Sequence, residues 1–226
     1  MCGRYSFAPT PKQRKSLEKQ VEVPSDLELR FNIAPTQKAY VITNEAPFHL
    51  QKMEWGLIPH WSPDGKNSGK LINARAEGIA EKPSFRKPIN SKRCLVPADS
   101  FYEWKKLPGG RKIPYRIFQK NETLLFFAGI WDEWGKAGEI KRTFSIITTS
   151  PNLEMRDLHN RMPVLLTDEE SQQLWLSPIP LNRHLTLLQT PKDGLLSRYP
   201  VSEKLNKPES EGAYLQIMVP EALVLF

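Results

Sequence analysis

The chain has 226 residues, of which 39% are hydrophobic and 25% charged, and it carries a net charge of +7 at neutral pH. This composition is that of a soluble globular protein and excludes a disordered chain. No apolar run reaches the roughly 18 residues that a membrane-spanning helix needs. No secretory signal is expected, because the N-terminus lacks an apolar segment. The length favours a single domain over residues 1–226.

The chain has two cysteines, Cys2 and Cys94, which cannot form a disulfide framework. Because neither a C-x-x-C pair nor an H-E-x-x-H motif occurs, we expect no metal and no cofactor. The reducing cytoplasm is the expected compartment. The excess of 32 Lys and Arg over 25 Asp and Glu suits a polyanionic partner but does not identify one.

Two helices are indicated by their N-terminal signals, and a third by composition. Thr10, Pro11 and Gln13 form a capping pattern that predicts a helix over residues 11–20. The run Thr167-Asp168-Glu169-Glu170 repeats this pattern before SQQLWLS. INARAEGIAEK is expected to form a short helix after Asn73, since Ala, Arg and Glu favour one. Twenty prolines make long helices improbable.

Most other apolar runs are short and rich in β-branched or aromatic residues, which predicts strands. They are AYVIT, CLVPA, YRIF, LLFFAGIW, FSIITT and MPVLL. Loops are expected at residues 62–70, at 105–112 and around VSEKLNKPESEG. We therefore predict an α+β fold with a mixed, mostly antiparallel sheet or barrel-like core and short peripheral helices.

Eight segments fit neither a strand nor a helix pattern, because polar residues interrupt them. They are MCGRYSF, RFNIAPTQ, EWGLIPHW, INARAEG, RCLVPADSFYEW, FAGIWDEW, TTSPN and LHNRMPVLL. Together and in this order they resemble the SOS response-associated peptidase (SRAP) family, whose members recognise abasic sites in single-stranded DNA and link themselves to them covalently. The resemblance runs from Met1 to about residue 207.

The resemblance implies a set of catalytic residues. The family's nucleophile, which follows the initiator methionine, corresponds to Cys2. The Asn of its N-A-R motif corresponds to Asn73, the Glu of F-Y-E-W to Glu103, and the His before x-R-M-P to His159. Asp99 is a weaker candidate for the proton-transfer role of Glu103.

The resemblance also implies contacts with DNA, by arginines that line a channel and by a tryptophan that packs against bases. The residues expected to contact DNA are Arg4, Asn32, Pro35, Trp61, Arg75, Thr148, Arg161 and Met162. His60 departs from many relatives, which have an aromatic or another polar residue before the tryptophan. The other motif tryptophans are expected in the core, because aromatic residues in sheets are more often buried.

The chemistry expected of Cys2 depends on removal of Met1. The new α-amino group, with a pKa of ~7.8, would be roughly a quarter neutral at pH 7.4, whereas lysine at ~10.4 would be neutral about one part in a thousand. This amine can attack the aldehyde of a ring-opened abasic sugar to give an imine. The adjacent thiol can then close a five-membered thiazolidine, which would suppress strand cleavage. The other interpretation of Cys2 is a residue in a frayed tail.

Each of the other three catalytic candidates also has a structural interpretation. Glu103 can shuttle protons if its aromatic neighbours raise its pKa, or it can be a surface ion-pair partner. His159 can hydrogen-bond the opened sugar or be a structural histidine. Asn73 can orient the aldehyde oxygen or cap the helix that follows it.

The predicted function is a sensor of abasic sites in single-stranded DNA that forms a single-turnover crosslink through Cys2, with associated autoproteolytic or peptidase activity and lyase-type activity. One alternative is a peptidase with Cys2 as an N-terminal nucleophile that acts on other proteins. Another is a non-covalent single-strand-binding module. We expect a cytoplasmic monomer that associates with the nucleoid when bound to DNA, with no membrane contact.

Overall fold

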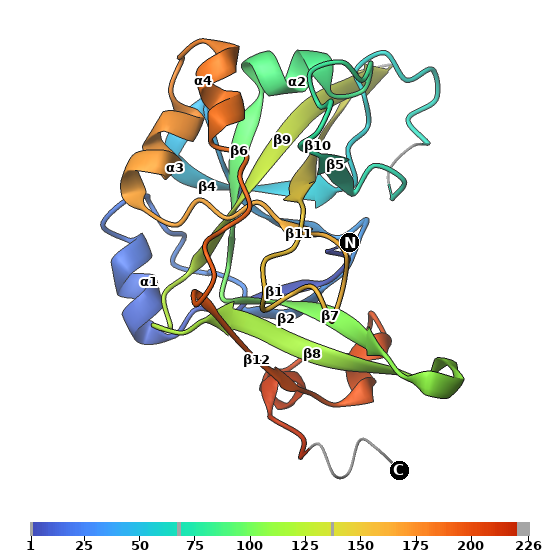
Figure 1. The fold of residues 1–226 in the computed structure, drawn as a ribbon. Helices are drawn as coiled ribbons and strands as arrows, with labels where there is room; N and C mark the ends of the chain where they lie inside the picture. Colours follow the sequence, from blue (N-terminus) through green and yellow to red (C-terminus); the bar gives the residue numbers. More distant parts are fainter. Residues whose placement is uncertain (1, 67–68, 137, 221–226) are drawn as a thin grey trace.

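The computed structural model describes residues 2–66, 69–136 and 138–220 of the chain. Within these ranges the fold is α+β, as the sequence predicts, with mostly antiparallel sheets and short helices around them (Figure 1). None of the helices in these ranges has the length and apolar character that crossing a bilayer requires.

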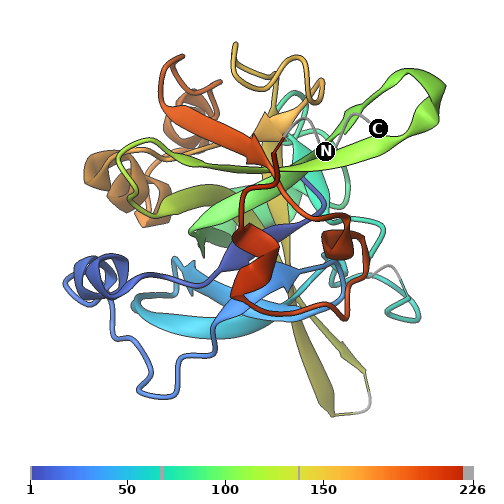
Figure 2. The ribbon, with the colours of Figure 1, turned by 90° about the horizontal axis from the view of Figure 1, so that it is seen from below.

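The first sheet has the strand order β12-β8-β7-β1-β2. Its strands are β1 (Tyr5–Phe7), β2 (Arg30–Ile33), β7 (Ser100–Lys106), β8 (Lys112–Gln119) and β12 (Leu196–Pro200). Tyr5 pairs with Phe101, so the N-terminal segment runs beside the first half of β7. Strands β7 and β8 form a hairpin that projects from the body of the protein (Figures 1 and 2).

The second sheet has the order β11-β10-β4-β3-β6-β9, and β5 also pairs with β10. Because β9 pairs with β10 as well, strands β10, β4, β3, β6 and β9 close into a barrel-like ring. Strands β4 and β5 run parallel to β10. The strands of this sheet are β3 (Lys38–Thr43), β4 (Ala46–Trp55), β5 (Asn73–Arg75), β6 (Arg93–Ala98), β9 (Leu125–Lys136), β10 (Glu139–Thr149) and β11 (Met162–Pro163).

The helices are short. The α-helices are α1 (Pro11–Leu17), α2 (Arg86–Ser91), α3 (Glu169–Leu176) and α4 (Leu181–Thr186), and the 3-10 helices are η1 (Pro108–Gly110), η2 (Glu203–Asn206) and η3 (Ala213–Gln216). The predicted capping box of α1 is confirmed, because Thr10 and Gln13 exchange hydrogen bonds. The cap of α3 is Asp168 rather than Thr167, since Asp168 accepts the bond from the first helical turn.

Two other sequence predictions need correction. No helix follows Asn73; residues 73–75 form β5, whose backbone pairs with the long strand β10. This pairing outweighs a weak helical propensity that Gly78, with φ at 69°, interrupts. The run MPVLL forms a strand only at Met162–Pro163, with a further isolated bridge at Leu165.

The core lies between the two sheets. The ring of Tyr5 packs edge-on against Trp55 and Phe127 of the second sheet, with ring centroids 5.2 and 5.9 Å apart. Trp55, Trp131 and Trp134 are buried, which confirms that most motif tryptophans belong to the core. The packing of Tyr5 fixes the strand into which the N-terminal segment runs.

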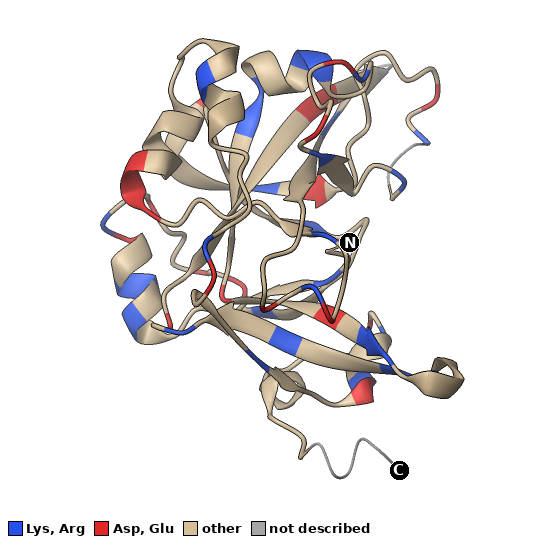
Figure 3. Cartoon of the chain, viewed as in Figure 1, with Lys and Arg blue, Asp and Glu red and all other residues tan. Residues whose placement is uncertain are grey.

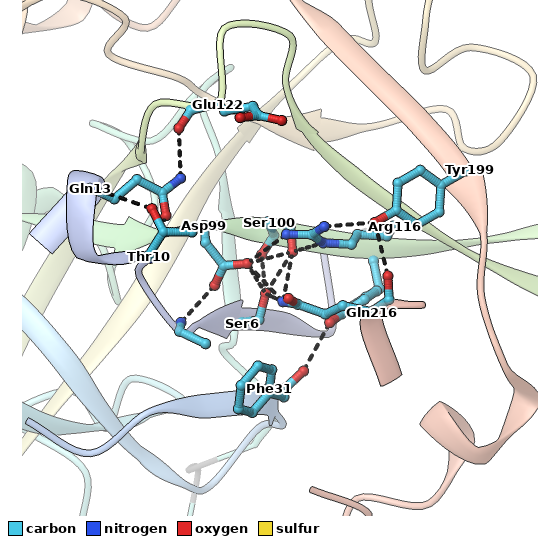
Figure 4. A network of polar contacts seen from close by, with 12 residues as sticks. Ser6, Thr10, Gln13, Phe31, Asp99, Ser100, Arg116, Glu122, Tyr199 and Gln216 are labelled. Atoms are coloured by element: carbon cyan, nitrogen blue, oxygen red, sulfur yellow. Dashed lines mark hydrogen bonds and ion pairs between the residues drawn. The ribbon is translucent and has the colours of Figure 1, made fainter. Parts of the chain in front are cut away.

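A buried polar network ties β1 to β7, β8 and η3 (Figure 4). Its centre is the carboxylate of Asp99, which is 3% exposed. This carboxylate accepts hydrogen bonds from Ser6 (3.1 Å), Ser100 (3.0 Å), Arg116 (3.0 Å) and Gln216 (2.7 Å). Charge-assisted bonds in a buried site are strong, so the network holds the N-terminal strand in register with β7.

Candidate active site

Cys2 lies three residues before β1, and its side chain is fully buried. Its backbone carbonyl accepts a hydrogen bond of 2.8 Å from Nδ2 of Asn73. Burial is the main reason that the pKa of the Cys2 thiol lies well above its usual range, and the charge of Glu103 raises it further. The sulfur is therefore a thiol at neutral pH, not a thiolate.

Asn73 is positioned by strand pairing, because β5 places it opposite Ile146 of β10. The carbonyl of Cys2 can only accept a hydrogen bond, so the side-chain atom facing it is the amide nitrogen. The amide oxygen, Oδ1, is buried and has no hydrogen-bond partner among the described residues. It is therefore able to accept a hydrogen bond from a substrate or an intermediate.

Glu103 lies on β7, two residues beyond the position that pairs with Tyr5. Its side chain is buried, and burial raises the pKa of its carboxyl above the usual range. The β1–β7 pairing brings its strand beside the N-terminal segment, and its charge is one cause of the raised pKa of the Cys2 thiol. A carboxyl with a raised pKa can exchange protons nearer to neutral pH than an exposed one.

His159 lies in the segment that precedes β11. Its Nδ1 accepts a hydrogen bond of 3.0 Å from the backbone N–H of Arg161, so the neutral ring carries its proton on Nε2. Partial burial is the largest cause that lowers the pKa of His159, and the charge of Lys106 adds to it. The imidazole is therefore neutral at pH 7.

Glu103 and His159 line one cavity of about 530 Å³. The other lining residues are Trp104, Lys106, Lys112 and Asn206. The cavity opens beside the β7–β8 hairpin, where Figure 3 shows basic segments on both strands next to an acidic one. Asn73 is thus joined to Cys2 by a hydrogen bond, and Glu103 and His159 share one cavity. Strand β7, which carries Glu103, pairs with the strand that follows Cys2.

Four residues predicted to contact DNA meet on β5, β10 and the approach to β11. Thr148 pairs with Arg75 on one side and with Pro163, next to Met162, on the other. The guanidinium of Arg161 donates to the Thr148 carbonyl at 2.5 Å. It also forms two hydrogen bonds of 2.8 Å with Glu77, whereas Arg75 is exposed.

Arg4, Asn32 and Met162 are buried. Arg4 donates to Asn32 Oδ1 and to the Leu205 carbonyl, each at 2.7 Å. The Met162 sulfur accepts from the backbone N–H of Asn152 at 3.3 Å. Pro35 is partly buried in the turn after β2.

Trp61 is 51% exposed, in the loop that follows β4. The residues on either side of it are anchored to β9. His60 binds Asp132 Oδ2 through its backbone N–H (2.9 Å) and Nδ1 (3.0 Å), and the Ser62 carbonyl accepts from Trp134 Nε1 at 2.7 Å. The unusual His60 thus fixes the loop that presents Trp61.

The family model described as SOS response associated peptidase (SRAP) matches residues 1–208. The chain belongs to the SRAP family. It is 47% identical over 189 residues to the abasic site processing protein YoqW of Bacillus subtilis, covering 82% of this chain and 84% of that protein. It is 30% identical over 200 residues to the abasic site processing protein HMCES of Gallus gallus, covering 77% of this chain and 57% of that protein.

A crystal structure of a protein from Bacteroides thetaiotaomicron is similar to this SRAP-family chain, with a TM-score of 0.83 and 32% identity. The match covers 97% of this chain and 100% of that one. The resemblance inferred from the eight motifs is therefore confirmed for the family and the fold.

Sequence reasoning overlooked three charged residues of this SRAP site. Lys106 and Lys112 lie in a segment predicted only as a loop, although a short connection that contains Gly109 and Gly110 between two strand-like runs is a hairpin signal. Glu77 lies in INARAEGIAEK, for which the sequence predicts a helix. Its carboxylate accepts a hydrogen bond from Arg161, which is the main cause that lowers the pKa of Glu77. The charges of Arg161 and Arg75 lower this pKa further.

Asp99 is not among the residues that line the cavity of Glu103, because its carboxylate belongs to the network of Figure 4. Across the described ranges, no three His, Cys, Asp or Glu side chains are grouped as metal ligands would be.

Proposed function

We propose that this chain recognises abasic sites in single-stranded DNA and traps them as a thiazolidine formed by Cys2 after removal of Met1. The observation that carries the proposal is the hydrogen bond from Asn73 to the Cys2 carbonyl, because it ties Cys2 to β5 while the β1–β7 pairing brings the same segment beside the strand of Glu103. Membership of a family whose curated relatives are named abasic site processing proteins supports a role in abasic-site DNA processing.

The amine, not the thiol, makes the first attack in this proposal. The raised pKa of the Cys2 thiol keeps it protonated at neutral pH. A free α-amino group on Cys2 would instead be partly neutral, with a reference pKa of about 7.8 that burial lowers. The buried position therefore favours the amine as the nucleophile that meets the aldehyde.

The reaction balances without an oxidant or a cofactor. The amine adds to the aldehyde carbon of the opened sugar, and loss of one water gives an imine. The imine forms in its protonated state; the sulfur then bonds to the same carbon, and the proton that the thiol gives up replaces the one used to release water. The products are a thiazolidine and one water. Ring closure consumes the imine, which otherwise acidifies the neighbouring C2′ hydrogen and leads to lyase-type strand cleavage.

Glu103 and His159 supply the proton transfers. Glu103 protonates the leaving hydroxyl of the carbinolamine and then accepts the thiol proton, and its raised pKa suits both steps. His159, neutral with its proton on Nε2, donates a hydrogen bond to an oxygen of the opened sugar. Oδ1 of Asn73 accepts from the amine or the carbinolamine hydroxyl.

DNA is held through its backbone and through stacking. The exposed Arg75 and the guanidinium of Arg161 offer positive charge along β5 and β10, and Trp61 offers a stacking surface that any base can use. The proposed partner is therefore single-stranded DNA read by its lesion rather than its sequence. The proposed form is a cytoplasmic monomer that joins the nucleoid when bound to DNA.

A second candidate function is peptidase activity of Cys2, which the description of the matching family favours. Its simplest form is autoproteolysis, in which the Cys2 sulfur takes the acyl group of Met1 and water releases methionine. The high pKa of the thiol makes this a slow, single event unless Glu103 accepts the proton. Peptidase action on other proteins ranks below it.

The experiment is a crosslinking assay with single-stranded DNA that carries one abasic site. The expected result is a shifted band that survives heating in denaturant and is lost in Cys2→Ala. Cys94→Ala is the matched control, because Cys94 is equally buried but lies on β6. A Cys2→Ala variant that crosslinks like the wild type would disprove the proposal.

A further inference from the structure

Lys106 and Lys112 face each other across the β7–β8 hairpin, as a directly opposed pair in the register of the two strands. Both are exposed. Directly opposed residues place their side chains on the same face of the sheet, about 5 Å apart at Cβ, and like charges there are destabilising. Within the described part of the chain, neither ammonium group forms an ion pair with a carboxylate. The pair thus has a cost that the fold does not offset.

The two lysines lie on the wall of the candidate active site. Both line the cavity that Glu103 and His159 share. The positive charge of Lys106 is also one cause that lowers the pKa of His159. Lys105, one residue earlier, lines a different pocket with Tyr115 and Arg198.

We propose that Lys106 and Lys112 together bind one backbone phosphate of single-stranded DNA, immediately next to the reacting sugar. The inference rests on the proposed function and assigns it a phosphate subsite. A phosphate between the two ammonium groups neutralises their repulsion, and lysine suits this role as a compact point charge. Because the cavity also contains His159 and Glu103, a phosphate bound there would hold its own sugar against them.

Lys106 and Lys112 approach the site from a different side than the two arginines, Arg75 and Arg161, that are proposed to bind DNA. Arg161 is bound to Glu77, and Arg75 lies with it at the β5–β10 edge, so these two hold the strand on one side of Cys2. The hairpin reaches the site from the other sheet. Contacts with the DNA backbone on both sides of the abasic sugar would fix the sugar between them. This raises the effective concentration of the aldehyde at Cys2.

The test is the affinity of the protein for a single-stranded oligonucleotide with a tetrahydrofuran analogue of the abasic site, measured by fluorescence anisotropy over a salt series. The analogue has no aldehyde, so binding is separated from crosslinking. For the double variant K106Q/K112Q we expect about tenfold weaker binding at low salt and a salt slope reduced by about 0.7, the value for one phosphate contact on a single strand.

Two controls match the change in charge. Lys105→Gln removes a charge from the same hairpin outside the cavity, and K12Q/K15Q removes two from α1, which lies away from the hairpin in Figure 1. Both controls are expected to keep the wild-type salt slope. If K106Q/K112Q keeps it too, the inference is wrong.

A neutral methylphosphonate at the linkage on either side of the analogue locates the contact. One of the two positions should weaken wild-type binding about tenfold but leave K106Q/K112Q binding unchanged. Equal losses in both proteins at both positions would overturn the assignment. If the wild type crosslinks abasic DNA while the double variant binds like its controls, only this inference fails; if the wild type forms no crosslink, the proposed function fails.

Discussion

The side chain of Asn73 donates a hydrogen bond of 2.8 Å to the backbone carbonyl of Cys2, and this bond joins the two sheets. Asn73 belongs to β5 at the edge of β10, whereas Cys2 leads into β1 of the other sheet. The position of the proposed nucleophile is thus set by both sheets, through this bond on one side and the β1–β7 pairing on the other.

Replacing Asn73 with alanine should slow crosslinking without weakening DNA binding. The lost hydrogen bond is worth about 0.5 to 1.5 kcal/mol, which predicts a rate about two- to tenfold lower from misplacement of Cys2 alone. Asn73→Asp should be slower still, because a carboxylate would face the Cys2 carbonyl. The measurements are the single-turnover crosslinking rate and the affinity for single-stranded DNA.

Asn90→Ala is the control for Asn73→Ala, since Asn90 also donates to a backbone carbonyl but does so on α2. It should crosslink at the wild-type rate. If Asn73→Ala crosslinks as fast as Asn90→Ala, the hydrogen bond to the Cys2 carbonyl does not position Cys2 for the reaction.

Glu103→Gln should lower the crosslinking rate by about a hundredfold, the usual contribution of one general acid–base group, and should leave DNA binding intact. The same change should not destabilise the protein at neutral pH. Because the folded-state pKa of Glu103 is raised, its stability contribution is full below the unfolded-state pKa and is lost as the pH rises through the folded-state pKa.

Thermal unfolding at several pH values checks the second half of this prediction. Glu103→Gln should equal or exceed the wild type in melting temperature at pH 7, with the difference vanishing below the unfolded-state pKa. A variant that is less stable at pH 7 and loses DNA binding would show that Glu103 has a structural role.

His159 should titrate below the usual histidine range. Burial lowers its pKa first, and the charge of Lys106 is one further cause, so Lys106→Gln should raise the pKa of His159. Nitrogen-15 NMR of the imidazole should report the proton on Nε2, because Nδ1 accepts from Arg161. A titration at or above 6.5, or the other tautomer, would contradict the role given to this residue.

The sequence predicted the architecture well where local signals were strong. The capping box at Thr10 predicts helix α1, and the six apolar runs predict strands that the structure contains, although only the first two residues of MPVLL form a strand. The failure was at Asn73. Its strand depends on β10, which is about 70 residues away in the chain, and propensity within INARAEGIAEK contains no information about that partner.

The candidate site was predicted as a set of residues but not as a geometry. Motifs named Cys2, Asn73, Glu103 and His159, yet only the fold places Asn73 on the Cys2 carbonyl. The sequence also predicts the same DNA-contacting role for Arg75, which is exposed, and for Arg4, which is buried. Arg4 is buried because it contacts a distant segment, η2, and the motifs contain no information about that contact.

The Asp99 network should make a large contribution to stability. Asp99→Asn leaves the charge of Arg116 without its ion-pair partner in a buried site, and breaking such a pair costs about 3 to 5 kcal/mol. The expected fall in melting temperature is about 2 to 4 °C for each kcal/mol in a protein of this size.

Asp157→Asn is the matched control for Asp99→Asn, because Asp157 also pairs with an arginine, Arg198, but is 45% exposed. It should cost less than about 1 kcal/mol. Equal effects of the two variants in chemical denaturation would show that the network adds no more than a surface ion pair.

The most direct test of the central claim is tandem mass spectrometry of the protein bound to abasic-site DNA, after denaturation, treatment with iodoacetamide, and digestion. We expect a peptide that begins at Cys2, lacks Met1, and carries the sugar with loss of one water. Its sulfur should be unalkylated, while Cys94 is alkylated. An adduct that retains Met1, lies on another residue, or leaves the Cys2 sulfur open to alkylation would contradict the account.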